Sequence, residues 1–269
     1  MTKVNTYSLL AQEGHLISSC LTTGLTELRS ADVHNKGAFY TALFNLSIGL
    51  ERLLKVIVII DHMVTNAMNA PSKELLMPYR HDIVKLYKSC VAISDKLGSP
   101  LKPFDKIDEI DKDMLRSLNK FADKSRYHNL DSLCSPTDKA DPLESWSKIL
   151  LRIVDNDVSK QRINKILCDA RKMSAAIKDC SHVAMVGLSN EPLTLESALT
   201  LPGLHEQGVR FAVLRLIKFL APIRDLLRDI SQAALCVNDS PKQAVPFMEE
   251  FLDWVWDDRS YVLRKRRWP

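Results

Sequence analysis

Apolar residues recur along most of the chain at intervals of three and four, the spacing that places them on one face of an α-helix. Alternating apolar and polar residues, which would indicate β-strands, do not extend over any useful length. The pattern therefore predicts an all-α protein. Helices are expected over about residues 6–29, 38–68, 80–97, 105–128, 143–154, 157–181, 206–235 and 244–264.

The richest group of turn-forming residues is the segment Ser-Pro-Thr-Asp-Lys-Ala-Asp-Pro at 135–142. We expect it to separate an antiparallel helical bundle, residues 1–135, from a second helical half, residues 143–269. The stretch 187–204 is too long for an ordinary loop, which predicts either a short helix or a functional loop within it.

The most apolar stretch, Val56–Ile60, is only five residues long and lies between Lys55 and Asp61. A membrane-spanning helix needs about 20 apolar residues, so this stretch predicts a buried helix and no membrane partner. The first residues lack the apolar core of a signal peptide, and the cysteines form no Cys-x-x-Cys pair. These features predict a cytoplasmic protein with reduced cysteines.

The formal net charge of +4 permits an anionic partner without requiring one. The chain closes on a basic run with aromatic neighbours: Tyr261, Arg264, Lys265, Arg266, Arg267 and Trp268. Such a run could bind nucleic acid, with cations on phosphates and a ring stacked on a base. A loose, solvated chain end is the alternative interpretation. The apolar and aromatic stretch 251–256 favours core or a subunit interface over base stacking.

The familiar catalytic motifs are absent: no Gly-x-Gly-x-x-Gly, Walker loop, His-Glu-x-x-His or Gly-x-Ser-x-Gly occurs. The seven histidines are dispersed along the chain. A conventional nucleotide-hydrolysing, hydride-transferring or zinc-dependent enzyme is therefore disfavoured, and we assign neither a metal nor a cofactor.

Three segments of the first half resemble the HEPN-like superfamily of helical domains in prokaryotic defence and toxin proteins. They are NKGAFYTALFNLSIGLERLLK at 35–55, RHDIVKL at 80–86 and FADKSRYHNLD at 121–131, in the order and spacing of that superfamily. The likeness covers about residues 1–135. It implies a small antiparallel bundle, frequent dimerisation and, in many members, metal-independent cleavage of RNA in antiviral or toxin systems.

Active members of the superfamily carry an Arg separated from a His by four to six residues on the last helix. In this chain His128 follows Arg126 by only two residues, and Asp131, Ser132 and Leu133 stand where histidine is expected. Two residues on one helix differ by about 200° of rotation, so the pair shares a site only if the helix ends between them. Asn129 could end it.

With the helix ended there, Arg126 would stabilise charge on a phosphate and His128 would transfer the proton of a ribose 2′-hydroxyl. The Arg126–Tyr127 pair also resembles members that bind nucleotides beside a nucleotidyltransferase and need no catalytic histidine. The alternative function is thus a non-enzymatic helical subunit that binds a protein partner, a nucleotide or nucleic acid. The expected partners are RNA or a nucleotide, and a second copy or another protein.

Other charged residues have two interpretations each. Arg52 and Lys55 either cover apolar surface with their stems or line a groove that attracts phosphate. Glu51, if buried, needs a partner, and Arg126 is the candidate. A second Arg-to-His spacing of the right length runs from Arg29 to His34, where the alternative is a helix end whose cations offset the dipole.

Overall fold

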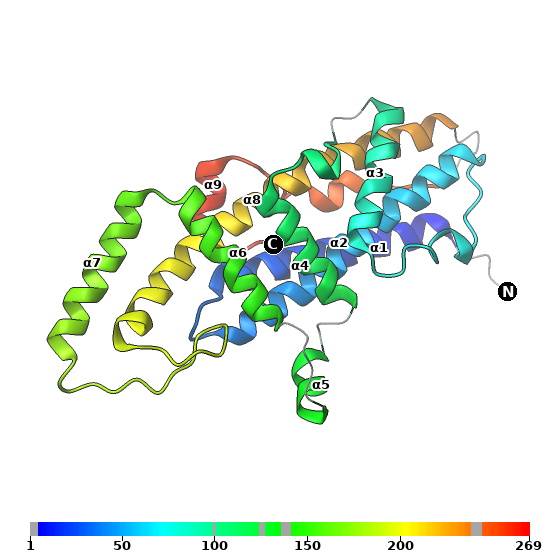
Figure 1. Cartoon of the computed structure of the whole chain (residues 1–269). Coiled ribbons are helices and arrows are strands. Elements are labelled where there is room, and N and C mark those ends of the chain that lie inside the picture. Colours follow the sequence, from blue (N-terminus) through cyan, green and yellow to red (C-terminus); the bar gives the residue numbers. More distant parts are fainter. Residues whose placement is uncertain (1–4, 99–100, 124–126, 136–140, 238–243) are drawn as a thin grey trace.

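The computed structural model describes residues 5–98, 101–123, 127–135, 141–237 and 244–269. Over these ranges the regular structure is helical, and the only β-type pairing is an isolated bridge between Val186 and Pro192. The predicted all-α class is therefore confirmed (Figure 1). No helix in the described ranges is long and apolar enough to cross a membrane.

The first two helices, α1 (Thr6–Ser30) and α2 (Lys36–Thr65), run side by side and form the most extensive helix pair (Figure 1). Glycines let their backbones approach closely. A Cβ on Gly24 would lie 2.7 Å from Leu46 Cγ, and one on Gly49 would lie 2.8 Å from Leu21. Residues of the Val56–Ile60 stretch are buried, apart from the half-buried Ile59. The prediction of a buried central helix is thus confirmed.

Shorter helical elements then follow in the first half of the chain: η1 (Lys73–Leu75), α3 (Ile83–Leu97), η2 (Phe104–Lys106), α4 (Glu109–Asp123) and α5 (His128–Cys134). The side chain of Asp82 caps the first turn of α3, and Gly98, with a left-handed φ of 70°, ends it. The prediction of one helix over 105–128 is wrong, because α4 ends at Asp123 and His128 begins a separate helix. Asn129 therefore lies inside α5 and does not end a helix.

The second half comprises α6 (Pro142–Asp157), α7 (Lys160–Ile177), α8 (Leu195–Val237), η4 (Met248–Leu252) and α9 (Arg259–Arg264). The helix α8 is 43 residues long and contains Pro202 and Pro222, so it takes up much of the stretch expected to be irregular. The single helix predicted over 244–264 is wrong. Two short helices replace it, and the Asp258 carboxylate caps the second by accepting from the Tyr261 N–H at 2.6 Å.

The helix α8 joins the two halves of the sequence, because it packs against α1, α2 and α3 as well as α6 and α7. Its Phe219 ring lies 5.1 Å from the Tyr87 ring of α3. Arg215 on α8 pairs with Asp108 and Asp111 at the start of α4 and with Asp157 at the end of α6. The segments 1–135 and 143–269 thus share one continuous core.

The C-terminal residues pack onto the helices. Trp268 is only 7% exposed, and its backbone N–H donates to Thr26 Oγ1 on α1 at 3.0 Å. Arg210 of α8 donates through Nε to the Leu263 carbonyl at 3.0 Å. The alternative of a loose chain end is therefore wrong. Within the aromatic stretch 251–256, Trp254 is core as predicted, whereas Trp256 is exposed.

Candidate functional site

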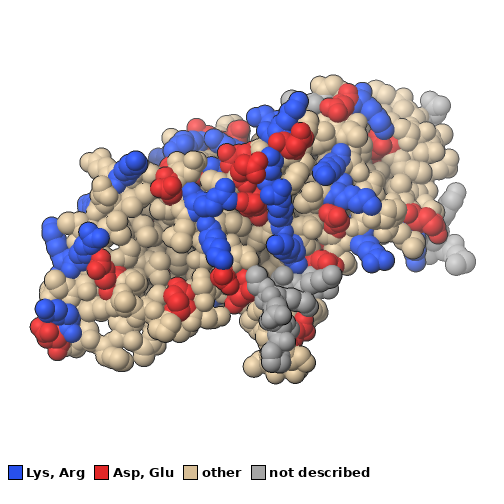
Figure 2. Space-filling view, in the orientation of Figure 1, with Lys and Arg blue, Asp and Glu red and all other residues tan. Residues whose placement is uncertain are grey.

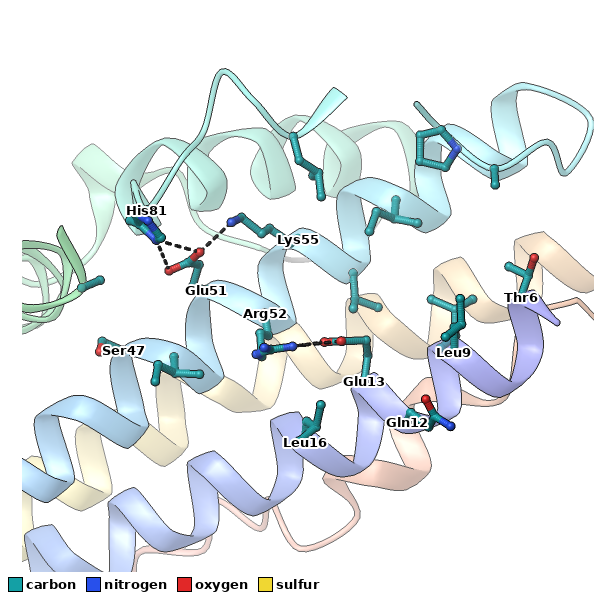
Figure 3. A pocket seen from close by; sticks show the side chains of 18 of the residues that line it. Thr6, Leu9, Gln12, Glu13, Leu16, Ser47, Glu51, Arg52, Lys55 and His81 are labelled. Atoms are coloured by element: carbon teal, nitrogen blue, oxygen red, sulfur yellow. Dashed lines mark hydrogen bonds and ion pairs between the residues drawn. The ribbon is translucent and has the colours of Figure 1, made fainter. Parts of the chain in front are cut away.

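A cavity of about 690 Å³ lies between α1 and α2, and we call it the α1–α2 cavity (Figure 3). The segment from Ala70 to His81 and the end of α4 at Phe121 and Ala122 complete its wall. Small-molecule sites in proteins usually occupy about 300–1,000 Å³ and are largely apolar with a few polar groups. The α1–α2 cavity has both properties.

Apolar side chains line the mouth of this cavity yet remain exposed. Leu9 and Leu16, seven residues apart on one face of α1, are 49% and 46% exposed, and Phe44 of α2 is 43% exposed. Deeper in the wall lie Val56 and Ile59 of α2. A solvent-accessible apolar surface of this kind is typical of a place where a ligand or partner binds.

Polar groups gather on the α2 wall of the cavity (Figure 3). Lys55 Nζ lies 2.6 Å from Glu51 Oε1, and His81 Nδ1 lies 3.1 and 3.2 Å from the two oxygens of the same carboxylate. An ionised carboxylate only accepts, so the Nδ1–H of His81 donates to Glu51. This hydrogen bond leaves Nε2 of His81 as the ring nitrogen that can accept a proton from a ligand.

A second ion pair crosses from α2 to α1. Arg52 Nη1 donates to both carboxylate oxygens of Glu13, at 2.9 and 2.7 Å. Both side chains are well exposed, so this pair contributes only about 0–1 kcal/mol to stability and can open for a competing anion.

Local sequence explains why these groups meet. Ile48, Glu51, Lys55 and Ile59 recur at three- and four-residue intervals, which puts them on one face of α2. His81 reaches that face from an irregular segment whose backbone takes left-handed φ values at Ala67, Met68 and Arg80. Lys85 Nζ donates to the Pro78 carbonyl at 2.9 Å and holds this segment to the start of α3.

The residues predicted as catalytic are placed only in part. Arg126 lies outside the described residues, and so does its predicted ion pair with Glu51, whose described partners are Lys55 and His81. His128 is the first residue of α5, and Tyr127 beside it is exposed. Asn129 Nδ2 donates to Tyr40 Oη at 3.0 Å, which ties the start of α5 to α2.

The predicted nucleic-acid contacts fall in three separate places, of which Tyr127 at the start of α5 is one. Arg52 and Lys55 line the α1–α2 cavity, whereas the basic run from Arg264 to Arg267 lies at the other end of α1, where the C-terminal residues pack. In that run Lys265 Nζ lies 2.5 Å from Tyr261 Oη, and Arg266 lies 3.9 Å from Glu206. Figure 2 shows acidic and basic side chains interspersed on one face of the molecule, without a continuous basic surface.

The second Arg-to-His spacing, from Arg29 to His34, does not bring its two side chains into one environment. Arg29 is buried beside Arg210, Glu206 and Arg266, whereas His34 is exposed. In the described residues no hydrogen bond joins the side chains of Arg29 and His34. The described part of the chain also contains no group of three His, Cys, Asp or Glu residues placed to hold a metal ion.

Comparisons of the chain with family models, curated proteins and solved structures find no match. The resemblance to HEPN-like domains thus stays a prediction carried by its three segments.

Sequence reasoning missed His81 and Glu13. His81 lies inside the segment 80–86 that resembles the superfamily, yet nothing in the sequence pairs it with Glu51 or gives it a role. Leu9 and Leu16 fit the apolar period of α1, which predicts burial, but both are exposed. Apolar residues on more than one face of that helix were the signal that one face is left uncovered.

Proposed function

We propose that the α1–α2 cavity binds one nucleotide unit of RNA, and that the protein is a HEPN-like protein of RNA metabolism or antiviral defence. The observation that carries this proposal is the cluster of His81, Glu51 and Lys55 on the wall of an otherwise apolar cavity. The apolar walls suit the face of a base, and Lys55 and Arg52 can exchange their carboxylate partners for a phosphate.

The same cluster suits metal-independent cleavage of RNA. His81 Nε2 would take the proton of a ribose 2′-hydroxyl while Glu51 holds the ring through Nδ1. The 2′-oxygen would then bond to phosphorus and the bond to the 5′-oxygen would break. Lys55 would give a proton to the departing oxygen, leaving a 2′,3′-cyclic phosphate and a 5′-hydroxyl. Arg126, outside the described residues, and His128, the first residue of α5, are the predicted second contributors.

The alternative function is a non-enzymatic subunit whose cavity receives an apolar helix of a protein partner. The observation that favours it is the exposure of Leu9, Leu16 and Phe44 at the cavity mouth. Grooves that bind amphipathic helices present apolar side chains in this way.

The deciding experiment follows cleavage of end-labelled single-stranded RNA in chelator by the wild type, His81→Ala and an Arg126→Ala/His128→Ala variant. His62→Ala is the control, because His62 is a partly exposed histidine in the last turn of α2 that does not line the cavity. Circular dichroism checks that each variant is folded. Cleavage lost in His81→Ala and kept in His62→Ala would support catalysis in the cavity.

Cleavage kept in His81→Ala but lost in the double variant would place the chemistry at the predicted pair and contradict the role of His81. If the wild type does not cleave, calorimetry with adenosine monophosphate and Phe44→Glu tests binding alone. Binding that Phe44→Glu abolishes would support a nucleotide site without catalysis. No binding by the folded wild type would overturn the proposal in favour of a protein partner.

A further inference from the structure

Arg29, in the last turn of α1, is a buried cation without a counter-ion. The residue is only 7% exposed, and within the described residues its side chain makes no hydrogen bond and no ion pair. The Nε atom is sealed from solvent with no acceptor. Buried guanidinium groups are almost always paired, because transfer of an unpaired charge out of water is costly.

The surroundings of Arg29 make this arrangement more unfavourable. Burial is the largest cause that lowers the pKa of Arg29, and the positive charges of Arg210 and Arg266 lower it further. Glu206 acts in the opposite direction, but it also lies 3.9 Å from Arg266. The one carboxylate that opposes this shift is thus paired with Arg266, and it makes no hydrogen bond or ion pair with Arg29.

Arg215, on the same helix as Arg210, provides the comparison within this chain. Its side chain is 13% exposed and has three carboxylate partners, Asp108, Asp111 and Asp157, at 2.6 to 2.9 Å. The fold thus supplies acids to a partly buried arginine where they serve structure. Near Arg29, which is also buried, the fold instead places two further arginines, Arg210 and Arg266.

Three separate segments contribute to this cluster, and their backbones are held in place, whereas the Arg266 side chain is 78% exposed. Arg29 is on α1, Arg210 is on α8, and Arg266 follows α9. The Trp268 N–H bonded to Thr26 and the Arg210 Nε bonded to the Leu263 carbonyl fix the C-terminal residues against both helices. Positively charged groups that are already held in place lose little freedom when they bind an anion.

We propose that Arg29, Arg210 and Arg266 form an oxyanion site that takes a phosphate group. Phosphate fits because it carries between one and two negative charges near neutral pH, and its oxygens match the fork of donors on a guanidinium group. The site is independent of the α1–α2 cavity: Glu13 and Arg29 are 16 residues apart, which is about 24 Å along the helix. Failure of one proposal therefore leaves the other untouched.

The test measures the thermal unfolding midpoint in inorganic phosphate and in sodium chloride at matched ionic strength. We expect phosphate to raise the midpoint of the wild type in a concentration-dependent way, because the folded state alone holds the site. Arg29→Met should fold in chloride, since it removes an unpaired charge, and should lose the phosphate response. The control is Arg171→Met, which removes an exposed arginine paired with Glu196 on a different surface.

Calorimetry with inorganic phosphate gives the affinity directly. We expect Arg29→Met and Arg210→Met each to weaken binding by about tenfold or more, the usual effect of losing a hydrogen bond to a charged group. Equal stabilisation of the wild type, Arg29→Met and Arg171→Met by phosphate would overturn the proposal. So would the absence of phosphate binding by the folded wild type.

A final arm distinguishes free phosphate from the phosphates of a polymer. If a single-stranded RNA oligonucleotide displaces phosphate, and Arg29→Met lowers its affinity and reduces its salt slope by about one, the site binds a nucleic-acid backbone. If the oligonucleotide binds both proteins equally while inorganic phosphate distinguishes them, the site binds free phosphate or a small phosphate ester. Both outcomes support the oxyanion site.

Discussion

His205 is a histidine that the fold keeps uncharged. It is 2% exposed, its ring meets Phe39 edge-on at 6.1 Å, and its Nδ1 has no partner in the described residues. Burial lowers its pKa from an ordinary 6.5 to about 4, and the charge of His34 acts in the same direction. Asp32 and Glu191 oppose this shift without overcoming it.

The lowered pKa of His205 predicts acid sensitivity. Below about pH 6.5 His205 binds a proton in the unfolded chain, whereas in the folded protein it does so only near pH 4. The free energy of unfolding therefore falls as the pH is lowered through this window. The full loss from this residue is about 3 kcal/mol. Between pH 7 and pH 4, we expect the free energy of unfolding of His205→Leu to fall by that much less than that of the wild type, as measured by urea titrations. If the free energy of unfolding of His205→Leu depended on pH as that of the wild type does, this prediction would be wrong. The control is His182→Leu, at an exposed site.

Arg215 contributes to stability through charge. In Arg215→Met the three aspartates would face one another without a cation, and we expect a loss of about 2–4 kcal/mol at neutral pH. Burial already raises the pKa of Asp111, and loss of Arg215 raises it further, so the deficit should shrink as the pH falls toward 4. Chemical denaturation at pH 7 and pH 4 measures both values. A deficit that is constant with pH would show that packing, not charge, is lost.

At the scale of elements, the close packing of α1 on α2 depends on Gly24. An alanine Cβ there would lie 2.7 Å from Leu46 Cγ and 3.0 Å from the Leu46 backbone N, and a backbone atom cannot move aside cheaply. We expect Gly24→Ala to destabilise the protein by about 1–3 kcal/mol, despite the better helix propensity of alanine.

Gly37 is the matched control for this change. It lies near the start of α2, and no other side chain or distant backbone atom comes within 4 Å of the place that an alanine Cβ would take. Gly37→Ala should therefore be neutral or slightly stabilising. Equal effects of the two substitutions in urea titrations would argue against close packing of α1 on α2.

Helical periodicity predicted most elements of this fold because nearly every helix buries one apolar face. It failed where side chains cap the backbone locally or where tertiary packing overrides a break. Asp258 caps α9 and so divides the helix expected over 244–264. Thr194 Oγ1 accepts from the Ser197 N–H at the start of α8, which lets the helix begin before Pro202 and run through it.

The candidate site was less predictable than the fold. Arg52 and Lys55 could be named from sequence because they belong to a segment that resembles a family. The contact between Glu51 and His81 could not be predicted. His81 belongs to an irregular segment with left-handed residues, and hydrophobic periodicity does not predict the course of such a segment. Burial of Arg29 beside Arg210 joins residues 181 positions apart and is a property of the folded chain only.

At the scale of the whole molecule, the shared core predicts that the first half cannot fold alone. A fragment ending at residue 135 would expose the faces of α1, α2 and α3 that α8 covers, including the Tyr87 ring. We expect the full chain to unfold in one cooperative transition and the fragment to show no cooperative transition in circular dichroism melts. A fragment with a sharp melt and full helical content would show instead that 1–135 is an independent domain.

The helix α7 has a different relation to this core. Ala170 is its only buried residue, and it packs against α8 at the edge of the molecule (Figure 1). Opening it would uncover little apolar surface, whereas opening α2 would uncover the centre of the protein. In heavy water, therefore, we expect the amides of α7 to take up deuterium by local opening, while those of α2 stay protected until the entire chain unfolds.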